Sequence, residues 1–301
     1  MVSIKPLVTV LMAVRNGWPY IEASVESILN QTYENFDFLI VDDASTDNTC
    51  EIIKSYGDPR IKLIHLSKNV GQTAALNVGI DQISTTWIAR MDADDYSDPT
   101  RLEKQIKASE INPLVCCIGT NCWVFKDDPN IIENIIKNPE NDIDIKKSML
   151  RNPSIVHGSI LIKLKDLLAA GGYNEKFRVS ADIDLYERLL TPSRLVMNIQ
   201  EPLLGFRIHA RQETKTLIAI DEGIEIFNRR LKNNHYSKKD KRIIRSKLVL
   251  FHLLRSRYHL RKFTLNKKIL IDIFNALLIS PTSFIVNIFK GLINFIKNLK
   301  H

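Results

Sequence analysis

The sequence has few cysteines and no long apolar run, and each absence excludes a class of protein. Its four cysteines form neither a CxxC pair nor a cysteine–histidine cluster with the spacing of zinc ligands. A disulfide scaffold is therefore excluded, and reduced thiols in a cytoplasmic protein are expected. The longest charge-free stretch, 273–289, has 17 residues and includes a proline, whereas a membrane-spanning helix needs about 20 apolar residues. No apolar stretch precedes the first expected strand, so no secretory signal is expected.

Three common motifs of nucleotide and acyl chemistry are also missing. No GxxxxGK[ST] loop and no GxGxxG after a strand is present, so ATP hydrolysis and nicotinamide binding lack their usual phosphate cradle. No GxSxG elbow indicates a serine hydrolase. The 301 residues, 45% hydrophobic and 25% charged, have the composition of a globular protein with one large domain or two modest ones.

Charge is unevenly distributed along the chain. Residues 221–301 contain 18 Lys and Arg against 5 Asp and Glu, whereas residues 1–220 contain 24 against 29. The net charge of +8 is therefore a property of the C-terminal part, which suits an anionic partner.

Short apolar runs alternate with amphipathic stretches over the first 120 residues. The runs are rich in β-branched residues, which predicts strands, and the stretches between them have the apolar spacing of helices. This alternation predicts an α/β fold with a mostly parallel central sheet flanked by helices. The expected strands are 7–14, 38–41, 61–66 and 87–91, and the expected helices are 20–29, 49–56, 73–83 and 100–111.

Acidic residues crowd two of the expected strand ends, where α/β sheets bind their ligands. Asp42 and Asp43 follow the second strand, and Asp92, Asp94 and Asp95 follow the fourth. Two carboxylates at i and i+2 can reach one hard divalent cation, and such an ion neutralises charge on a diphosphate leaving group. A carboxylate after the second strand can accept a hydrogen bond from a nucleobase or a ribose hydroxyl.

Each acidic cluster also has a structural interpretation. The Asp92 cluster suits a solvated acidic turn, and an EF-hand loop is a further alternative, although Tyr96 and Ser97 occupy positions that want an acidic or amide side chain and a glycine. Residues 45–47 offer N-caps for the helix at 49–56, and Asp98-Pro99 offers one for the next helix.

A third acidic pair begins an amphipathic helix in the middle of the chain. Asp182 and Asp184 suit the N-terminal end of a helix dipole, and either one suits a general base for an acceptor hydroxyl. His157, Arg207 and His209 are structural groups or contacts to substrate and phosphate.

Taken together, these motifs resemble the family 2 glycosyltransferases, an inverting group with the GT-A fold, of the bacterial cell-surface glycan type. The resemblance is close over residues 6–125 and weaker to about 215, and beyond that no motif is recognised. The close motifs are 6–17, 27–33, 41–47, 69–71 with 75–77, and 89–95 with 101–102. The weaker ones are 152–153 with His157, 171–173, 182–185 and 207–209.

The resemblance implies a GT-A domain at 1–215, with a nucleotide-binding half at 1–111 and an acceptor-binding half at 112–215. A basic helical region at 216–301 follows it. The resemblance also implies Asp182 as catalytic base, with Asp184 as the fallback. It implies a nucleotide-sugar site of Ala13, Arg15, Asn16, Asp42, Asp43, Asn69, Gly71, Arg90, Asp92 and Arg207, and a Mn²⁺ or Mg²⁺ site of Asp94, Asp95 and His209.

Two residues depart from the family's pattern. Many members have tyrosine where this chain has Arg15, so stacking on the base would come from a guanidinium group. Many also have glutamate before the catalytic base, where this chain has Ala181.

The implied activity is metal-dependent transfer of a hexosyl or N-acetylhexosaminyl group, with inversion, from a nucleotide-diphosphate sugar. UDP is the family's commonest carrier. The acceptor is a hydroxyl of a glycan or lipid-linked glycan in cell-surface polysaccharide biosynthesis. The main alternative is a catalytically inactive nucleotide-binding protein of this fold. An aspartyl phosphotransferase is a second alternative. Nucleic-acid binding is not expected, because the basic tail lacks a recognisable reading module.

The end of the chain reads as a basic amphipathic helix. Such a helix either lies on an anionic membrane, peripheral to the inner face of the plasma membrane, or packs on its own domain or a second subunit. Its expected apolar face is Phe284, Ile285, Ile288, Phe289, Leu292, Ile296 and Leu299.

Overall fold

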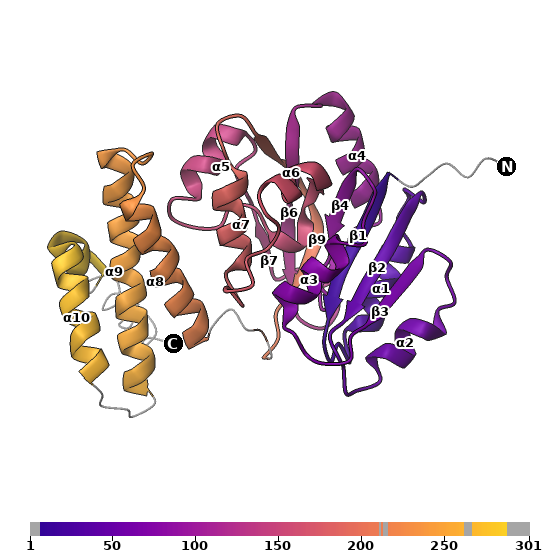
Figure 1. Ribbon diagram of the computed structural model, residues 1–301, viewed down its shortest axis with the longest axis horizontal. Coiled ribbons are helices and arrows are strands. Elements are labelled where there is room, and N and C mark those ends of the chain that lie inside the picture. Colours follow the sequence, from indigo (N-terminus) through magenta and orange to yellow (C-terminus); the bar gives the residue numbers. More distant parts are fainter. Residues whose placement is uncertain (1–6, 211, 213–215, 262–266, 288–301) are drawn as a thin grey trace. The chain divides into compact units, whose positions relative to one another are not determined.

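The computed structural model describes residues 7–210, 212, 216–261 and 267–287, and the chain separates into two compact units (Figure 1). The first unit comprises residues 1–149 and 153–211, and the second comprises residues 150–152 and 212–301. The domain boundary expected at residue 215 lies beside this division.

The first unit is built on one sheet with the strand order β3–β2–β1–β4–β8–β6–β9–β5, with β7 beside β6. Strands β3, β2, β1 and β4 are parallel to one another, and β6 is parallel to β9. Strands β8, β7 and β5 pair antiparallel with their neighbours. The strands are β1 Val8–Val14, β2 Phe36–Asp42, β3 Ile61–His65, β4 Trp87–Arg90, β5 Tyr96–Ser97, β6 Val115–Phe125, β7 Asn134–Ile136, β8 Leu161–Lys163 and β9 Leu195–Arg207.

Helices connect the parallel strands, as the alternating sequence predicts. The α/β prediction is confirmed, and the expected elements of the first 111 residues agree with the observed ones to within a few residues. The helices of this unit are α1 Ile21–Leu29, α2 Thr49–Ser55, α3 Gln72–Ile80, α4 Arg101–Ile111, α5 Asp142–Ser148, α6 Leu164–Ala169 and α7 Ala181–Leu189, with a short 3-10 helix, η1, at His157–Ser159.

Two expected helix caps are wrong in detail. Helix α2 has Asn48 at its N-cap, with no side-chain cap bond. Of the three expected caps, Ser45 hydrogen-bonds Asp42, whereas Asp47 accepts the N–H of Thr49, the first residue of the helix, at 3.1 Å. Helix α4 has Thr100 at its N-cap, and Asp98, two residues earlier, accepts the Thr100 N–H at 2.8 Å. Ser45 and Asp98 thus hydrogen-bond residues two or three positions away, in local turns, in place of the expected cap bonds.

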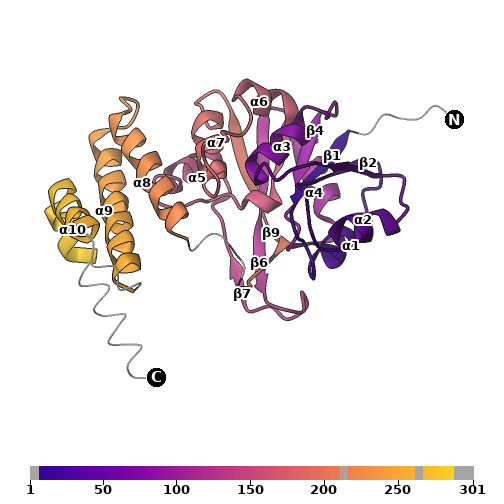
Figure 2. The same ribbon diagram turned by 60° about the horizontal axis from the view of Figure 1, so that its bottom comes forward.

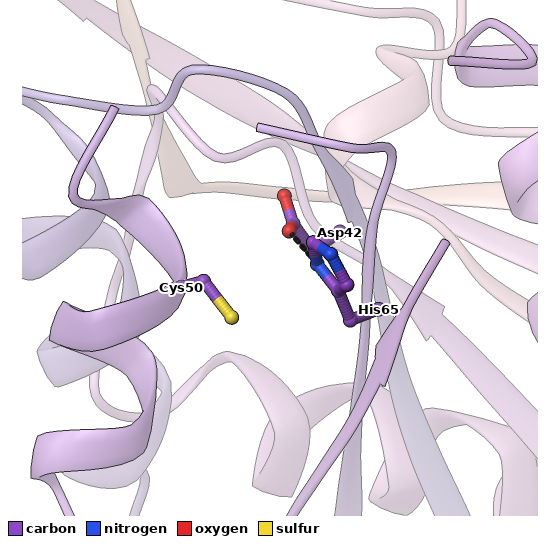
Figure 3. A group of neighbouring side chains, drawn as sticks. All are labelled: Asp42, Cys50 and His65. Carbon is purple, nitrogen blue, oxygen red and sulfur yellow. Dashed lines mark hydrogen bonds and ion pairs between the residues drawn. The ribbon is translucent and has the colours of Figure 1, made fainter. Parts of the chain in front are cut away.

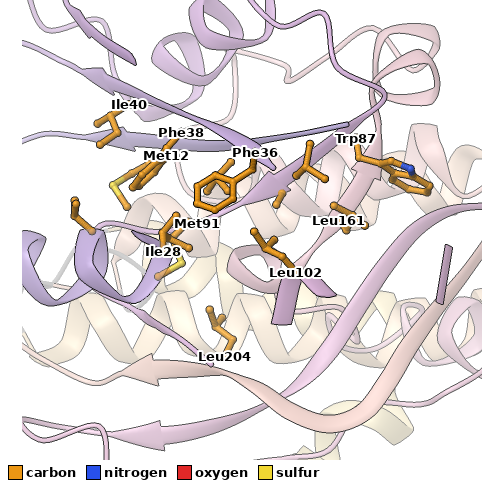
Figure 4. Packing of buried hydrophobic residues seen from close by; sticks show 14 of the residues in the cluster. Met12, Ile28, Phe36, Phe38, Ile40, Trp87, Met91, Leu102, Leu161 and Leu204 are labelled. Atoms are coloured by element: carbon orange, nitrogen blue, oxygen red, sulfur yellow. The ribbon is translucent and has the colours of Figure 1, made fainter. Parts of the chain in front are cut away.

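The two faces of β1 pack against different helices, because side chains alternate along a strand. Its even-numbered residues join Ile21, Val25 and Ile28 of α1 in the main hydrophobic core (Figure 4). On the other face, Leu11 lies so close to Gly79 of α3 that a Cβ there would meet its Cδ1 at 2.5 Å. Figure 2 shows α3 and α1 on opposite sides of the sheet. This packing fixes the strand ends that carry the acidic clusters.

The second unit is helical, as expected for a C-terminal extension. Aromatic contact between Phe227 and Phe251, with ring centroids 5.4 Å apart, joins two of its helices. None of the helices among the described residues has the length and apolarity needed to cross a bilayer. Of the expected apolar tail face, Phe284 and Ile285 are described and the remaining residues lie outside the described part. The helices are α8 Leu217–Lys232, α9 Lys238–Arg261 and α10 Lys267–Ile279.

Candidate active site

The ends of three parallel strands form the floor of the candidate site. Val14, the last residue of β1, is in register with Asp42 at the end of β2. Strand β4 lies on the other side of β1 and ends at Arg90. The segments that follow these strands are therefore neighbours at one edge of the sheet, as expected from the sequence.

The loop after β1 is held by the loop after β2. The backbone N–H of Asn16 donates to Ser45 Oγ at 2.9 Å, and Asn16 Oδ1 accepts the Thr46 N–H at 2.8 Å. Asn16 and Ala44 both have left-handed backbones, with φ of 53° and 54°, which cost of order 1–3 kcal/mol for residues other than glycine. Asn16 thus shapes the loop, and its contact with a donor stays a prediction.

Two predicted base contacts, one near the end of β1 and one in the loop after it, differ in accessibility. Ala13 is buried at 5% exposure, whereas the side chain of Arg15 is exposed. Arg15 can therefore reach a bound base from the solvent side, while Ala13 can contribute only a small surface from the floor.

Asp43 organises the loop between β3 and α3. Its carboxylate accepts the backbone N–H groups of Val70 at 2.7 Å and Gly71 at 2.8 Å. Gly71 has φ of 90°, a conformation that glycine adopts without strain. Asn69 Oδ1 also accepts the Gly71 N–H, at 3.0 Å. Three predicted site residues therefore form one hydrogen-bonded loop.

This loop reaches the second acidic cluster through Gln72. Gln72 directly follows Gly71, whose N–H is bound by Asp43. The Gln72 Nε2 donates to Asp92 Oδ1 at 3.3 Å. The carboxylates at the ends of β2 and β4 therefore border one site. Sequence reasoning missed Gln72, because nothing in the local sequence marks a glutamine whose partner lies 20 residues away.

Asp42 lies beneath the same edge in a group with Cys50 and His65 (Figure 3). The potential ligand atoms of these three residues lie within 4.8 Å of one another. However, Asp42 Oδ2 and His65 Nδ1 are hydrogen-bonded at 2.6 Å, closer than the roughly 3.3 Å between two ligands of a tetrahedral zinc ion. The other oxygen of Asp42 accepts from Ser45. Hydrogen bonding therefore accounts for the arrangement of Asp42 and His65.

Arg90 is buried and orients Asp92. Its Nη2 donates to Asp92 Oδ1 at 2.6 Å, and the Arg90 side chain is 2% exposed. The negative charge of Asp92 is the main influence that raises the pKa of Arg90 against the opposing effect of burial. Arg90 therefore orients Asp92 from the buried side of the acidic cluster. Its predicted contact with the donor would pass through Asp92 in this arrangement.

The end of β9 closes the other side of the cluster. His209 Nε2 and Asp94 Oδ2 are 2.8 Å apart, and Asp95 Oδ1 accepts the backbone N–H of Arg207 at 3.0 Å. The Arg207 guanidinium donates to the Asp94 carbonyl at 2.7 Å and lies 4.7 Å from the ring centroid of Tyr20. The structure thus brings Arg207 and His209 to the acidic cluster, more than 110 residues away in sequence. Nothing in the sequence around Tyr20 indicated that it would lie beside Arg207 at this site.

The electrostatics of the cluster suit a hard divalent cation. Burial and the charge of Asp92 raise the pKa of Asp94. Burial and the charges of Asp94 and Asp92 raise the pKa of Asp95 well above its ordinary value. Crowded carboxylates of this kind are relieved by a cation with oxygen ligands. An ion shared by Asp94 and His209 would replace their present hydrogen bond.

An EF-hand does not fit here. The cluster follows strand β4 rather than a helix, and the last residue of such a loop, Glu103, accepts a hydrogen bond from Thr32 instead.

Asp182 lies in the first turn of α7. Burial, followed by the charge of Asp92, raises its pKa to about 6, against a hydrogen bond from the Ile183 N–H. The charge of Asp92 acts on it, so the two carboxylates belong to one electrostatic site. Asp184, the fallback base, is fully buried and pairs with Arg188 at 2.8 Å. The two candidates therefore differ. The raised pKa of Asp182 suits a proton acceptor, whereas Asp184 forms a buried ion pair with Arg188.

His157 connects helix α7 to the acidic cluster. Its Nδ1 is 3.0 Å from Tyr186 Oη, one turn after Asp182 on α7, and its Nε2 is 2.8 Å from Tyr173 Oη. The next residue, Gly158, packs so closely that a Cβ there would lie 3.1 Å from carboxylate oxygens of both Asp92 and Asp95. Burial lowers the pKa of His157 to about 3, so the ring is neutral and must donate to one tyrosine and accept from the other.

Replacing His157 by phenylalanine is expected to destabilise the protein, because two buried tyrosine hydroxyls lose their partner at about 1–3 kcal/mol each. The unfolded chain protonates this histidine below about pH 6.5, whereas the folded chain does so only near pH 3. The contribution of His157 to stability therefore falls with falling pH, by about 1.4 kcal/mol per pH unit for this one proton. Urea unfolding at pH 7 and pH 5 should show that the variant lacks this loss, so the difference in unfolding free energy between the wild type and the variant is smaller at pH 5 than at pH 7. Tyr186→Phe is the matched control, since it keeps the histidine, and an unchanged slope in His157→Phe would contradict the assignment.

Comparison with known sequences decides the family. Residues 9–168 match the family described as glycosyl transferase family 2. The chain belongs to this family. The putative glycosyltransferase EpsE of Bacillus subtilis is 33% identical over 240 residues, which cover 75% of this chain and 84% of EpsE. The O-antigen biosynthesis glycosyltransferase WbnJ of Escherichia coli is 33% identical over 224 residues, 72% of this chain and 85% of WbnJ.

Solved structures share the GT-A fold of this family 2 glycosyltransferase. The S. aureus TarS 1–349 complex with UDP-GlcNAc matches with a TM-score of 0.69 at 14% identity, covering 90% of this chain and 81% of that one. The mannosyltransferase PcManGT from Pyrobaculum calidifontis, in complex with GDP-Man and Mn²⁺, matches with a TM-score of 0.60 at 17% identity, covering 96% and 81%. The resemblance and the fold expected from the sequence are confirmed, and the protein is a glycosyltransferase. The roles of individual site residues stay predictions.

Proposed function

We propose that this glycosyltransferase transfers a sugar, with inversion, from a nucleotide-diphosphate sugar to a hydroxyl of a glycan or lipid-linked glycan. Solved structures of the same fold are complexes with UDP-GlcNAc and GDP-Man, which supports this donor class, and we take UDP as the carrier. The name of one relative, the O-antigen biosynthesis glycosyltransferase WbnJ, supports a role in cell-surface polysaccharide synthesis.

One observation carries the proposal: a carboxylate whose pKa is raised to about 6 stands within the electrostatic reach of the strand-end acidic cluster. A general base works best when its pKa lies near the operating pH, and Asp182 meets that condition. Desolvation is the main cause of its raised pKa, so the group is a stronger proton acceptor than an exposed aspartate.

The chain's own residues divide the work as follows. Asp43, which holds the loop of Val70 and Gly71, retains carboxylate lone pairs that can accept a hydrogen bond from a base or ribose. Asp182 accepts the proton of the acceptor hydroxyl while that oxygen attacks the anomeric carbon. The bond from this carbon to the diphosphate oxygen breaks on the opposite face, and its electron pair leaves with the nucleotide. One displacement inverts the configuration.

Asp94, with Asp95 and His209, would hold Mn²⁺ or Mg²⁺. When bound, such an ion stabilises the charge that develops on the departing diphosphate. Arg90, by its 2.6 Å bond to Asp92, keeps that carboxylate facing the site, and Arg207 fixes the backbone of Asp94 from the other side.

A thermal-shift panel tests the donor class directly. The purified protein is heated with UDP, GDP and their sugars, with and without manganese. We expect stabilisation by one nucleotide diphosphate that grows in manganese, because a ligand that binds the folded state raises its stability in proportion to the logarithm of its concentration. Release of nucleotide diphosphate from the selected sugar donor, with an acceptor present, then measures transfer. No shift with any nucleotide would contradict the proposal.

A further inference from the structure

Helix α10 turns its apolar side chains outward. Ile271, Phe274 and Leu278 are 53%, 59% and 65% exposed, and their i, i+3, i+7 spacing places them on one side of the helix. On the opposite side, Asp272 and Ala276 are fully buried. A helix of a globular protein ordinarily has the reverse arrangement, with apolar residues inward and polar residues outward.

A buried polar network holds α10 in this orientation. The Asp272 carboxylate accepts from Arg255 Nε at 2.9 Å and lies 3.0 Å from His252 Nδ1, both on α9. Arg255 also pairs with Asp221 of α8 at 2.8 Å. Turning the apolar side of α10 inward would leave Asp272 without these partners, and buried charges are stable only when paired. The outward apolar side is therefore fixed by the fold of this unit.

The exposed apolar side chains extend beyond these three. Ile285 and Val286, in the helical segment 281–287 after α10, are 52% and 50% exposed. We call the whole set the α10 face. It comprises Ile271, Ile273, Phe274, Leu277, Leu278, Ile285 and Val286. An apolar group of this extent on a water-soluble unit marks a surface that binds something.

The charge of the same unit identifies the partner. Residues 221–301 contain 18 Lys and Arg against 5 Asp and Glu, and two of the five acids, Asp221 and Asp272, already pair with Arg255. The exposed basic residues of α8 and α9 are Arg229, Lys232, Lys238, Lys239, Arg242, Arg245 and Arg257.

An apolar side combined with surplus positive charge fits the interface of an anionic bilayer, where apolar side chains enter the acyl boundary and basic ones meet the headgroups. A second copy of the chain would bring the same positive charge and be repelled. Nucleic acid would use the charge and leave the apolar side exposed.

We propose that the α10 face binds the surface of an anionic lipid bilayer, with the helix lying in the plane of the interface. This binding surface is distinct from the donor site and does not depend on the proposed reaction. It would keep the enzyme beside a lipid-linked acceptor.

Co-sedimentation of the full chain with vesicles tests the proposal. Vesicles of equal parts phosphatidylglycerol and phosphatidylcholine are compared with vesicles of phosphatidylcholine alone. The test variant is Phe274→Ser with Leu278→Ser, and we expect its partition coefficient on anionic vesicles to fall at least about tenfold, since both side chains lose burial in lipid. Binding of the wild type should also weaken between about 0.1 M and about 1 M salt, because screening removes the headgroup attraction.

The matched control replaces two exposed leucines of the first unit, Leu114→Ser with Leu168→Ser, which are 75% and 53% exposed. This control should sediment like the wild type, and both double variants should keep the same unfolding midpoint and affinity for nucleotide diphosphate. Equal binding of the wild type to neutral vesicles, or undiminished binding of the α10 variant, would overturn the proposal. A wild-type dimer that the α10 variant dissociates, seen by light scattering without lipid, would assign the face to a second copy instead.

Discussion

Replacing Asp182 by asparagine is expected to lower kcat by about 10²–10⁴-fold, the usual contribution of a positioned general base. Asparagine has the same shape and cannot accept the proton of the acceptor hydroxyl. The folded-state pKa of Asp182, about 6, lies above the usual value for aspartate, so at pH 7 its ionised form costs stability rather than adding it. The variant should therefore unfold at the same or a slightly higher temperature, and its affinity for nucleotide diphosphate should be unchanged.

The pH dependence of the wild type provides a second measurement of the same group. Because Asp182 must be deprotonated to act, kcat/KM should fall about tenfold for each pH unit below about 6 and level off above it. Asp184→Asn is the matched control. It breaks the 2.8 Å pair with Arg188 in the interior, so it should lower the unfolding temperature while the active fraction keeps the pH profile. If Asp182→Asn transferred sugar at a near-normal rate, the base would be assigned to the wrong residue.

The strand-end clusters could be predicted from the sequence because everything they need is local. An apolar run followed directly by Asp42-Asp43 or by Asp92–Asp95 indicates where a strand ends and which carboxylates lie at that end. The packing of α1 and α3 on either side of β1 follows from the same periodicity, since alternate residues must face opposite layers.

Contacts between distant segments could not be predicted in this way. Gln72 meets Asp92 and His157 meets both Tyr173 and Tyr186 only through the fold. These residues have ordinary local sequences, and their roles appear when segments far apart in the chain come together.

The α10 face shows a further limit of periodicity. Apolar spacing predicts a helix with two unlike sides, and the usual expectation places the apolar side inward. Here Asp272 lies inward because His252 and Arg255 of another helix meet it there. Which side of an amphipathic helix is buried thus depends on partners that the helix's own sequence does not contain.

Replacing Asp94 by asparagine is expected to remove most of the metal-dependent part of nucleotide binding. Loss of residues that merely support metal ligands typically costs 10–100-fold in metal affinity, so loss of a ligand charge should cost about 100-fold or more. Asparagine keeps one oxygen in place beside His209, whose Nε2 is 2.8 Å from the native carboxylate, and so limits structural change. Calorimetric titration of nucleotide diphosphate, with manganese and with a chelator, measures the effect.

The design of this titration separates metal binding from general charge loss. Asp81, an exposed residue at the C-cap of α3, has the same charge outside the site, and Asp81→Asn should bind nucleotide like the wild type in both conditions. Removing one of the crowded carboxylates also relieves the repulsion that raises the pKa of Asp95, so the Asp94 variant should fold at least as stably as the wild type without metal. An Asp94→Asn protein whose nucleotide affinity still rose with manganese as in the wild type would move the cation site away from this cluster.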